Sequence, residues 1–373
     1  MKIAYITGGN PYDKRSWSGI DYHTRKALEK QGHSIYCIYG YKRITLKMIL
    51  YKLYAKITKK NYQAIRTIES SKGWAKYITS NLQKDTDAIF SLSTIPVAFL
   101  ETNIPIYIYI DGIFEYMLNN GFKRLLNSIK EAHLIENMAI KRCTNLITSS
   151  TESADVIKQY YKIEDSKLKV VPLGANFDIW PSEDEIESII SNRSKRVCKI
   201  LFVGVRWERK GADIVIETCN LLHQSGFPIE LHLVGLNTIP IPLPSYVINH
   251  GFINKMIKKE SDKLSRLYQD SHFLFVPSRG EAYGLVFSEA SAHGVPSISH
   301  SIGGIPTIIK HGINGELFNI GTPPDTFASY IKDTFMNYDS YVRLAFSSYK
   351  RFTEELSLDI AGNRLNQIIS SNK

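Results

Sequence analysis

Two carboxylates eight residues apart mark the most chemically informative stretch of the sequence, residues 273–318. Glu281 stands in the loop after a strand-like apolar run, and Glu289 lies inside a helix expected to begin near Gly284. The start of that helix, Tyr283–Val286, offers backbone N–H groups and the positive end of the helix dipole, which suit a phosphate. Carboxylates beside such a seat suit hydroxyl groups instead, such as those of two sugars. The stretch therefore predicts a phosphate site flanked by two groups that bind hydroxyls.

Two cations four residues apart follow another expected strand. In ILFVGVRWERKGAD, residues 200–213, the strand runs into Gly204, and Arg206 and Lys210 precede the next helix. Both charges can converge on a diphosphate at the carboxyl edge of the same sheet. The alternative is a pair of solvated cations on a surface loop. The neighbouring Glu281 motif favours the diphosphate interpretation.

The first strand-to-helix connection is a weaker signal. A strand at Lys2–Thr7 is followed by two glycines, the loop SWSG and a helix expected at Ile20–Lys30. Gly19 falls where a glycine would let a backbone N–H reach across a cleft, although glycine in such a loop is usually turn chemistry. The full GxGxxG spacing is absent, so this is not a dinucleotide fingerprint.

Short apolar runs alternate with segments of helical character, once in each half of the chain. Several runs are apolar at consecutive positions, as expected for strands covered by helices on both faces. The order predicts an α/β protein with two Rossmann-like, doubly wound parallel-sheet domains, each with its ligand edge at the carboxyl ends of its strands. The expected strands are Lys2–Thr7, Ser34–Tyr39, Ala88–Leu92, Ile106–Ile110, Leu146–Ser149, Lys199–Val203, Glu230–Val234, Val247–His250, Phe273–Val276 and Pro296–Ser299.

A linker is expected at residues 176–187, where Pro181 interrupts the chain, Ser182 can cap a helix and an acidic cluster follows. A chain of 373 residues also exceeds the roughly 250–300 residues at which single cores stop growing. We therefore expect a division into residues 1–178, 179–345 and 346–373. The last segment looks helical and could pack back across the first domain.

The charge is unevenly distributed. Lysine and arginine number 46 against 36 aspartates and glutamates, and the whole net charge of +10 lies in residues 1–182. A basic half suggests nucleic acid, an anionic membrane surface or a phosphorylated substrate. A generally lysine-rich proteome would give the same composition. The 43% hydrophobic and 22% charged residues exclude a disordered or fibrous chain.

One basic segment, Lys42–Lys60, contains seven basic residues and no acidic one. Within it, apolar residues follow helical spacing at positions 46, 49, 50, 53 and 57. Two interpretations stay open. The segment is either a basic amphipathic helix that lies on anionic lipid, or a surface helix that packs its apolar side on the core while its lysines are solvated.

The cysteines, the apolar runs and one Asp-x-Asp sequence indicate the cellular compartment and whether a metal site is expected. The four cysteines are widely spread, without zinc-type or redox-type spacing, which fits a reducing cytoplasm. The longest apolar run is far short of the roughly 20 residues of a membrane span, and the amino terminus lacks a secretory signal. Asp85-Thr86-Asp87 precedes a strand, so a solvated turn is expected there, not a metal site. We expect a cytoplasmic protein, with peripheral contact at the inner membrane face if the basic helix binds lipid.

Together these motifs resemble the retaining nucleotide-sugar glycosyltransferases of the GT-B fold, specifically family 4 (glycosyl transferases group 1). The resemblance covers nearly the whole chain and is most specific in residues 199–318. It is carried by Glu281-x7-Glu289, PSRGEAYG, FVGVRWERKG, VVPLGAN at 170–176, GGIP and HGINGELF. It implies two Rossmann-like domains facing across a cleft, an acceptor domain at 1–178 and a nucleotide-sugar domain at 179–345. It implies no metal and no cofactor beyond the donor substrate.

The resemblance also implies residue roles. Glu281 would contact the hydroxyls of the transferred sugar, and Glu289 the ribose of the nucleotide. Backbone groups at the helix start, including Tyr283, Gly284 and Leu285, would hold the distal phosphate. Arg206 and Lys210 would neutralise the diphosphate, and Gly19 would face the same phosphate from the first domain. Base-contacting residues are expected around Gly251–Met256.

Asp111, which ends the Ile106–Ile110 strand, matches a position near the sugar and acceptor where many family members carry histidine. Its alternative role is a helix cap. Two further departures concern fine contacts: Val205 fills the place directly after Gly204 where arginine is common, and Thr307 follows GGIP where glutamate is common.

The implied function is a hexosyltransferase that uses a nucleotide-diphosphate sugar and acts on a glycan or lipid-linked glycan, in cell-surface polysaccharide or glycolipid synthesis. A nucleotide-sugar epimerase of similar two-domain architecture is the alternative enzyme. A basic nucleic-acid-binding protein ranks last, since no recognition motif or basic stretch interleaved with aromatics supports it.

Overall fold

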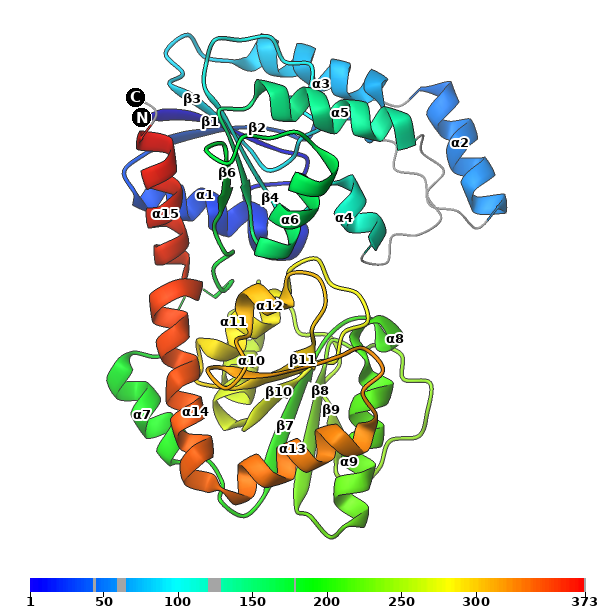
Figure 1. Cartoon of the computed structure of the whole chain (residues 1–373), viewed down its shortest axis with the longest axis vertical. Coiled ribbons are helices and arrows are strands. Elements are labelled where there is room, and N and C mark those ends of the chain that lie inside the picture. Colours follow the sequence, from blue (N-terminus) through cyan, green and yellow to red (C-terminus); the bar gives the residue numbers. More distant parts are fainter. Residues whose placement is uncertain (43–44, 59–64, 120–128, 178, 372–373) are drawn as a thin grey trace. The chain divides into compact units, whose positions relative to one another are not determined.

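The computed structural model describes residues 1–42, 45–58, 65–119, 129–177 and 179–371 (Figure 1). Arg43, Lys59 and Lys60 of the predicted basic segment, and the side chain of Lys47, lie outside the described residues. The chain divides into two compact units. Unit 1 is Met1–Pro172 with Ala361–Lys373, and unit 2 is Leu173–Ile360. The division falls a few residues before the boundary expected from the sequence.

Unit 1 contains a six-stranded parallel sheet in the order β2-β1-β3-β4-β5-β6. In register, Ile3 of β1 pairs with Ile35 of β2 on one side and Ala88 of β3 on the other. The central strands β3, β4 and β5 are buried along their whole length, which explains their continuous apolar runs. The strands are β1 Lys2–Thr7, β2 Ser34–Tyr39, β3 Ala88–Ser91, β4 Ile106–Ile110, β5 Asn145–Thr148 and β6 Leu168–Val170.

Three helices of unit 1, α2, α3 and α6, begin at polar caps. Thr45, Thr67 and Ser150 each accept a hydrogen bond from the backbone N–H three residues on, as N-cap residues do. The helices are α1 Ile20–Lys30, α2 Leu46–Ile57, α3 Ile68–Asn81, α4 Phe114–Asn119, α5 Ile129–Arg142 and α6 Thr151–Tyr160.

Helix α15, Leu358–Ser370, ends the described chain, and from Ala361 onward it belongs to unit 1. Tyr107 of β4 donates a hydrogen bond to the carbonyl of Ile369 at 3.1 Å. A Cβ added at Gly362 would lie 3.1 Å from the carbonyl oxygen of Ala27, so this glycine lets α15 approach α1 closely. The end of the chain is thus part of the first unit's packing.

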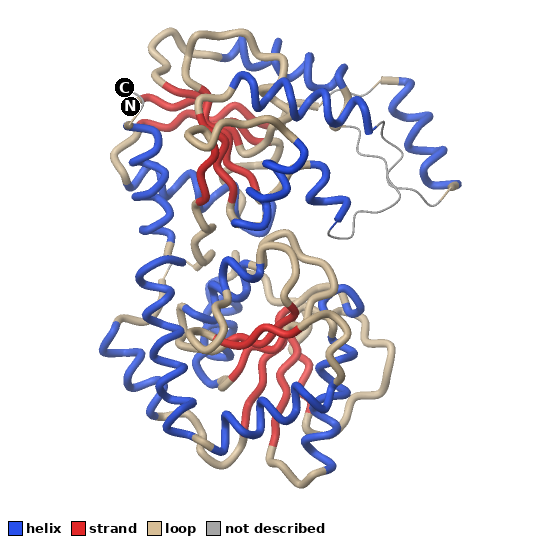
Figure 2. Tube along the Cα trace, in the orientation of Figure 1, coloured by secondary structure: helices blue, strands red, loops and turns tan. Residues whose placement is uncertain are grey.

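Unit 2 repeats the architecture with a parallel sheet in the order β12-β11-β10-β7-β8-β9. Figure 2 shows helices surrounding the strands in each unit. The strands are β7 Cys198–Val203, β8 Ile229–Val234, β9 Val247–Asn249, β10 Phe273–Phe275, β11 Ser297–His300 and β12 Gly315–Phe318. The helices are α7 Glu183–Ser191, α8 Trp207–Lys210, α9 Ala212–Gln224, α10 Lys258–Asp270, α11 Leu285–Ser291, α12 Ile305–Ile308, α13 Pro324–Met336 and α14 Tyr338–Arg351.

The predicted α/β class with two parallel sheets is confirmed, and each of the ten expected strands is present. Ser182 caps α7 in a capping box with Glu185, as predicted. Two edge strands, β6 and β12, were not predicted, because both are short and partly exposed, without a continuous apolar run. No described helix combines the length and apolarity needed to cross a membrane.

Candidate functional site

The residues predicted to carry chemistry in unit 2 follow strands β7 and β10, which neighbour each other in the sheet. Because all strands of this sheet are parallel, the loops that leave them meet at one edge. Lys210 ends α8 after the loop from β7, and Glu281 lies in the loop from β10 to α11. The structure brings these two side chains into direct contact.

Glu281 and Lys210 form an ion pair through Oε2 and Nζ. Both side chains are nearly buried, at 11% and 9% exposure, so the pair is shielded from solvent. The other carboxylate oxygen of Glu281, Oε1, lies 3.8 Å from Arg209. Breaking such a pair leaves an uncompensated charge, which is costly in a shielded position. The carboxylate is therefore held firmly at the sheet edge by two cations.

Side-chain and backbone contacts hold the loop after β7 against the loop after β10. Arg279 binds Asp213 at the start of α9 through two hydrogen bonds of 2.7 and 2.6 Å. Its backbone N–H donates to the carbonyl of Arg209 at 2.8 Å. Gly211, with φ of +73°, lets the chain pass so close to Pro277 that an added Cβ would lie 2.3 Å from its carbonyl oxygen. The position of Lys210 relative to Glu281 is thus fixed by both main chain and side chains.

Glu289 lies on α11 and is 2% exposed. Its Oε1 forms an ion pair with Lys255, and its Oε2 accepts a hydrogen bond from the Tyr268 hydroxyl at 3.3 Å. The Lys255 ammonium also lies 4.8 Å from the ring centroid of Phe177. Burial, followed by the charge of Glu289, raises the pKa of the Tyr268 hydroxyl well above its ordinary value, so Tyr268 stays a donor. Both oxygens of the buried carboxylate therefore have partners.

The start of α11 is shaped by Gly284, the N-cap residue, whose φ is +104°. A side chain there would be strained, and its Cβ would lie 2.8 Å from the ring of Phe287. The next residue, Leu285, is partly exposed, and the first N–H groups of a helix have no partner within it. Tyr283 is anchored by a hydrogen bond from its buried hydroxyl to the carbonyl of Leu173, at 2.9 Å. Its side chain braces the turn, so only its backbone is available for the predicted role.

Arg206 and Lys210 do not share one partner. Arg206 is the N-cap residue of α8, and its carbonyl accepts the backbone N–H of Lys210 at 3.0 Å. The Arg206 side chain is exposed and forms no ion pair with any residue that the structure describes. Lys210 instead forms an ion pair with Glu281. Of the two predicted cations, one is engaged with a carboxylate and the other faces solvent.

In unit 1, Gly19 and Asp111 occupy the carboxyl edge of the sheet, after β1 and β4 respectively. Gly19 is buried at the N-cap of α1 with φ of +87°, and Trp17 and Ser18 before it also have positive φ. Asp111 is partly exposed directly after β4. A carboxylate that sequence reasoning missed, Asp21, is buried and accepts hydrogen bonds from the hydroxyls of Thr7 and Ser16. These hydrogen bonds to Asp21 connect the end of β1 and the loop after it to the start of α1.

The principal residues missed in unit 2 are Lys255, Tyr268 and Arg209. Lys255 stands in the segment Gly251–Met256, which the sequence analysis associated with the nucleotide base, but nothing local shows that its ammonium reaches α11. Tyr268 occupies an ordinary core position of α10. These partners come from tertiary packing, so only a general argument that buried carboxylates need partners could have suggested them.

No group of histidine, cysteine, aspartate and glutamate suited to a metal ion occurs among the described residues. The Asp85-Thr86-Asp87 sequence has a structural role. Asp85 forms an ion pair with the Lys2 side chain at 2.7 Å, and Asp87 accepts the backbone N–H of Lys2, also at 2.7 Å. These contacts fix the turn before β3 to the start of β1.

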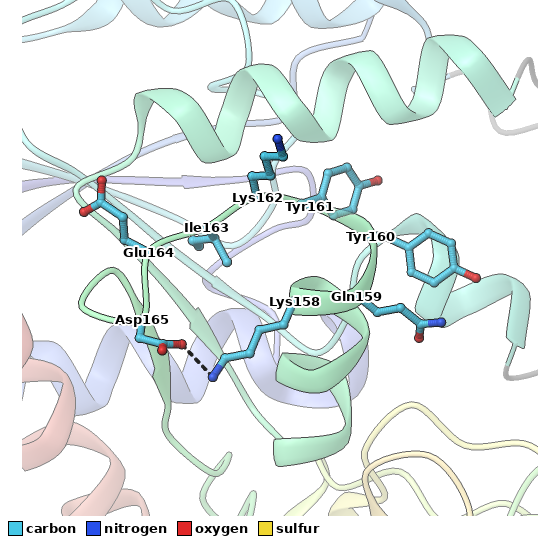
Figure 3. Close-up of a pocket in the computed structure, with 8 residues that line it drawn as sticks. All are labelled: Lys158, Gln159, Tyr160, Tyr161, Lys162, Ile163, Glu164 and Asp165. Carbon is cyan, nitrogen blue, oxygen red and sulfur yellow. Dashed lines mark ion pairs between the residues drawn. The ribbon is translucent and has the colours of Figure 1, made fainter.

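A shallow hollow of about 750 Å³ lies elsewhere in unit 1 (Figure 3). It is lined by Lys158–Asp165, from the end of α6 and the loop that enters β6. Lys158 and Asp165 form an exposed ion pair across it at 2.7 Å. Loops that enter parallel strands lie at the amino edge of a sheet, whereas ligands of such sheets bind at the carboxyl edge. The hollow contains none of the predicted site residues.

The amino-acid sequence matches known proteins over part of its length. Residues 197–337 match the family Glycosyl transferases group 1. An uncharacterized glycosyltransferase of Methanocaldococcus jannaschii is 27% identical over 196 residues, which cover 50% of this chain and 50% of that protein. The chain spans about half the length of the curated relatives that it matches. The predicted resemblance to this family is confirmed.

Solved structures match over the whole chain. Sucrose-phosphate synthase from Thermosynechococcus elongatus has a TM-score of 0.73 and 14% identity, covering 100% of this chain and 99% of that one. Anabaena HepE in complex with UDP-glucose has a TM-score of 0.66 and 14% identity, covering 100% of both chains. At these identities the likeness shows the fold alone. The fold is that of the GT-B glycosyltransferases, as expected from the sequence.

Proposed function

We propose that the protein is a retaining, metal-independent hexosyltransferase. The proposal starts from the GT-B fold and from the match of residues 197–337 to glycosyl transferases group 1. The enzyme transfers a hexose from a nucleotide-diphosphate sugar to a glycan or lipid-linked glycan in cell-surface polysaccharide or glycolipid synthesis. The observation that carries the proposal is the Glu281–Lys210 ion pair at the carboxyl edge of the unit 2 sheet, next to the helix start at Gly284. HepE, which was crystallised with UDP-glucose, supports the class of donor.

The donor would lie along the loops after β7 and β10. We assign the hydroxyls of the transferred sugar to Glu281 and the ribose hydroxyls to Glu289. The backbone at Gly284 and Leu285 would bind the distal phosphate with the positive end of α11. Lys210 would then lie between the Glu281 carboxylate and the diphosphate, so its charge serves both. Arg206, which is exposed, is free to turn toward the diphosphate when the donor binds.

The chemistry follows from where charge develops. Breaking the sugar–phosphate bond places positive charge on the sugar ring and negative charge on the departing diphosphate. Arg206, Lys210 and the helix start would stabilise that negative charge, as preorganised donors do. With retention, the acceptor hydroxyl attacks from the face of the leaving group, and the diphosphate helps remove its proton. No protein nucleophile is assigned, and no metal or further cofactor is required.

Unit 1 would receive the acceptor. The net charge of +10 lies in residues 1–182, most of which belong to this unit, and a basic field suits phosphate-bearing acceptors such as lipid pyrophosphates. Asp111, at the carboxyl edge of the unit 1 sheet, remains the predicted residue near the sugar and acceptor. The predicted role of Gly19 at the phosphate likewise stays a prediction.

The test is turnover of nucleotide sugars by Glu281→Gln, measured as released nucleoside diphosphate and transferred sugar. We expect a loss of about 100-fold or more, the size typical for removing one group that stabilises a transition state. Glu217→Gln, an exposed site on α9, is the matched control and should retain wild-type turnover. EDTA should leave the wild-type rate unchanged. Unchanged turnover by Glu281→Gln, or an epimerised donor without sugar transfer, would overturn the proposal.

A further inference from the structure

Helix α2, Leu46–Ile57, exposes its apolar residues. Leu46, Ile49, Leu50, Leu53 and Ile57 are 44% to 79% exposed, whereas apolar residues of a globular surface helix normally face the core. Since an α-helix turns by about 100° per residue, these five positions fall within one arc of the helix. Met48 and Ala55, on the opposite side, are buried, and the other side chains of the helix that the structure describes are exposed. The helix thus buries Met48 and Ala55 and presents its apolar stripe to solvent.

This arrangement contradicts one interpretation of the basic segment, a surface helix that packs its apolar side on the core. If the helix packed its apolar side on the core, residues of the stripe would be buried, and the structure places each of the five in solvent. Tyr54, at the margin of the stripe, is also exposed. Contiguous exposed apolar surface of this kind marks an interaction site.

Charge identifies the kind of partner. Lys52 and Lys56 are exposed on α2 beside the stripe, and the sequence from Lys42 to Lys60 contains no acidic residue. An apolar stripe flanked by lysines is complementary to an anionic bilayer, because the apolar residues enter the acyl boundary while the ammonium groups remain at the headgroups. With 12 residues the helix is about 18 Å long, which suits lying in the interface.

We propose that the exposed face of α2, formed by Leu46, Ile49, Leu50, Leu53 and Ile57 with Lys52 and Lys56, docks the protein on an anionic lipid bilayer. The inference does not rest on the glycosyltransferase assignment. If that assignment holds, docking would bring unit 1 to the surface where lipid-linked acceptors reside.

The test is co-flotation of the full chain with vesicles of phosphatidylcholine containing 30% phosphatidylglycerol, compared with phosphatidylcholine alone, at low and high salt. We expect binding to anionic vesicles that weakens with salt. Leu50→Glu/Leu53→Glu should abolish it, whereas Ile320→Glu/Met336→Glu, at exposed apolar sites of unit 2, should bind like the wild type. Lys52→Gln/Lys56→Gln should weaken binding by about fivefold per lysine. Thermal unfolding should be unchanged in these variants, because the substituted side chains are exposed.

Three results would overturn the proposal: equal binding to neutral and anionic vesicles, retained binding by Leu50→Glu/Leu53→Glu, or self-association that this variant abolishes. The last result, seen by sedimentation velocity without vesicles, would make a second copy of the chain the occupant. Turnover of a water-soluble donor should be unaffected by Leu50→Glu/Leu53→Glu. Failure of docking and failure of the proposed function are therefore separate outcomes.

Discussion

At the residue scale, the contacts of Glu289 show what the proposed ribose contact would require of a buried carboxylate. Lys255 and Tyr268 each hold one oxygen, so the carboxylate is oriented before a ligand arrives. A ribose hydroxyl can donate to either oxygen in addition, since each carboxylate oxygen accepts more than one hydrogen bond. Lys255 is therefore a positioning residue in this account, acting through Glu289.

Lys255→Met should weaken donor binding, because the substitution leaves Glu289 without the cation that orients it. We expect a rise of about tenfold or more in the dissociation constant of the nucleoside diphosphate, since hydrogen bonds to charged groups contribute roughly 1.5–3 kcal/mol. Titration calorimetry would measure it. Lys258→Met, at an exposed lysine of α10, is the matched control. An unchanged dissociation constant in Lys255→Met would show that Glu289 needs no such partner or does not contact the donor.

At the element scale, His272 connects β10 to β7, and its protonation differs between the folded and the unfolded chain. Its Nδ1 accepts the backbone N–H of Lys199 at 2.9 Å, and its Nε2 donates to the carbonyl of Ser194 at 2.8 Å. The bond to Nδ1 requires the neutral ring, because a protonated Nδ1 cannot accept, whereas Nε2–H can donate in either state. Burial, with the nearby charge of Arg193, lowers the pKa of His272 to about 3. In the unfolded chain the pKa returns to about 6.5.

Between these two values the unfolded chain binds the proton and the folded chain does not, so acid destabilises the fold. The contribution of His272 is complete above about pH 6.5 and is lost as the pH falls toward 3. From pH 7 to pH 5 it should lower the free energy of unfolding by about 2 kcal/mol. Burial also lowers the pKa of His250, His293 and His300, so His272→Gln should still lose stability over this range. Urea unfolding at both pH values should show a loss about 2 kcal/mol larger in the wild type and in His223→Gln, an exposed control, than in His272→Gln. Equal losses in the wild type and in His272→Gln would contradict the assignment.

Several elements were predictable because their signals are local. Continuous apolar runs identified the ten expected strands, and the PSRGEAYG loop identified Glu281 and the helix start at Gly284. The edge strands β6 and β12 were not predicted, since both are short and partly exposed and lack a continuous apolar run. The contacts of Glu289 with Lys255 and of Glu281 with Lys210 depend likewise on tertiary packing. For α2, the sequence gives amphipathicity but not the direction of its apolar face, which only the surrounding fold determines.

At the scale of the whole molecule, the proposal assigns donor binding to unit 2, and acceptor and membrane binding to unit 1. Unit 2 carries the Glu281–Lys210 and Glu289–Lys255 pairs at its sheet edge, and the family match lies within it. Unit 1 carries the excess positive charge and the exposed face of α2. In this proposal the donor site lies in one unit, and the acceptor and membrane surfaces lie in the other. Donor chemistry and acceptor recognition could then change independently, because one fold can carry different sites.

Calorimetric titration of the full chain with UDP, GDP and ADP tests most directly whether unit 2 binds a nucleoside diphosphate. We predict that one of the three binds and that Arg206→Ala weakens its binding by about tenfold, because a cation at the diphosphate is lost. Arg206 is exposed and unpaired among the described residues, so the substitution should leave the fold intact, and Arg266→Ala on α10 serves as the exposed control. Absence of binding by all three nucleotides, or equal affinity in Arg206→Ala and the wild type, would contradict the account.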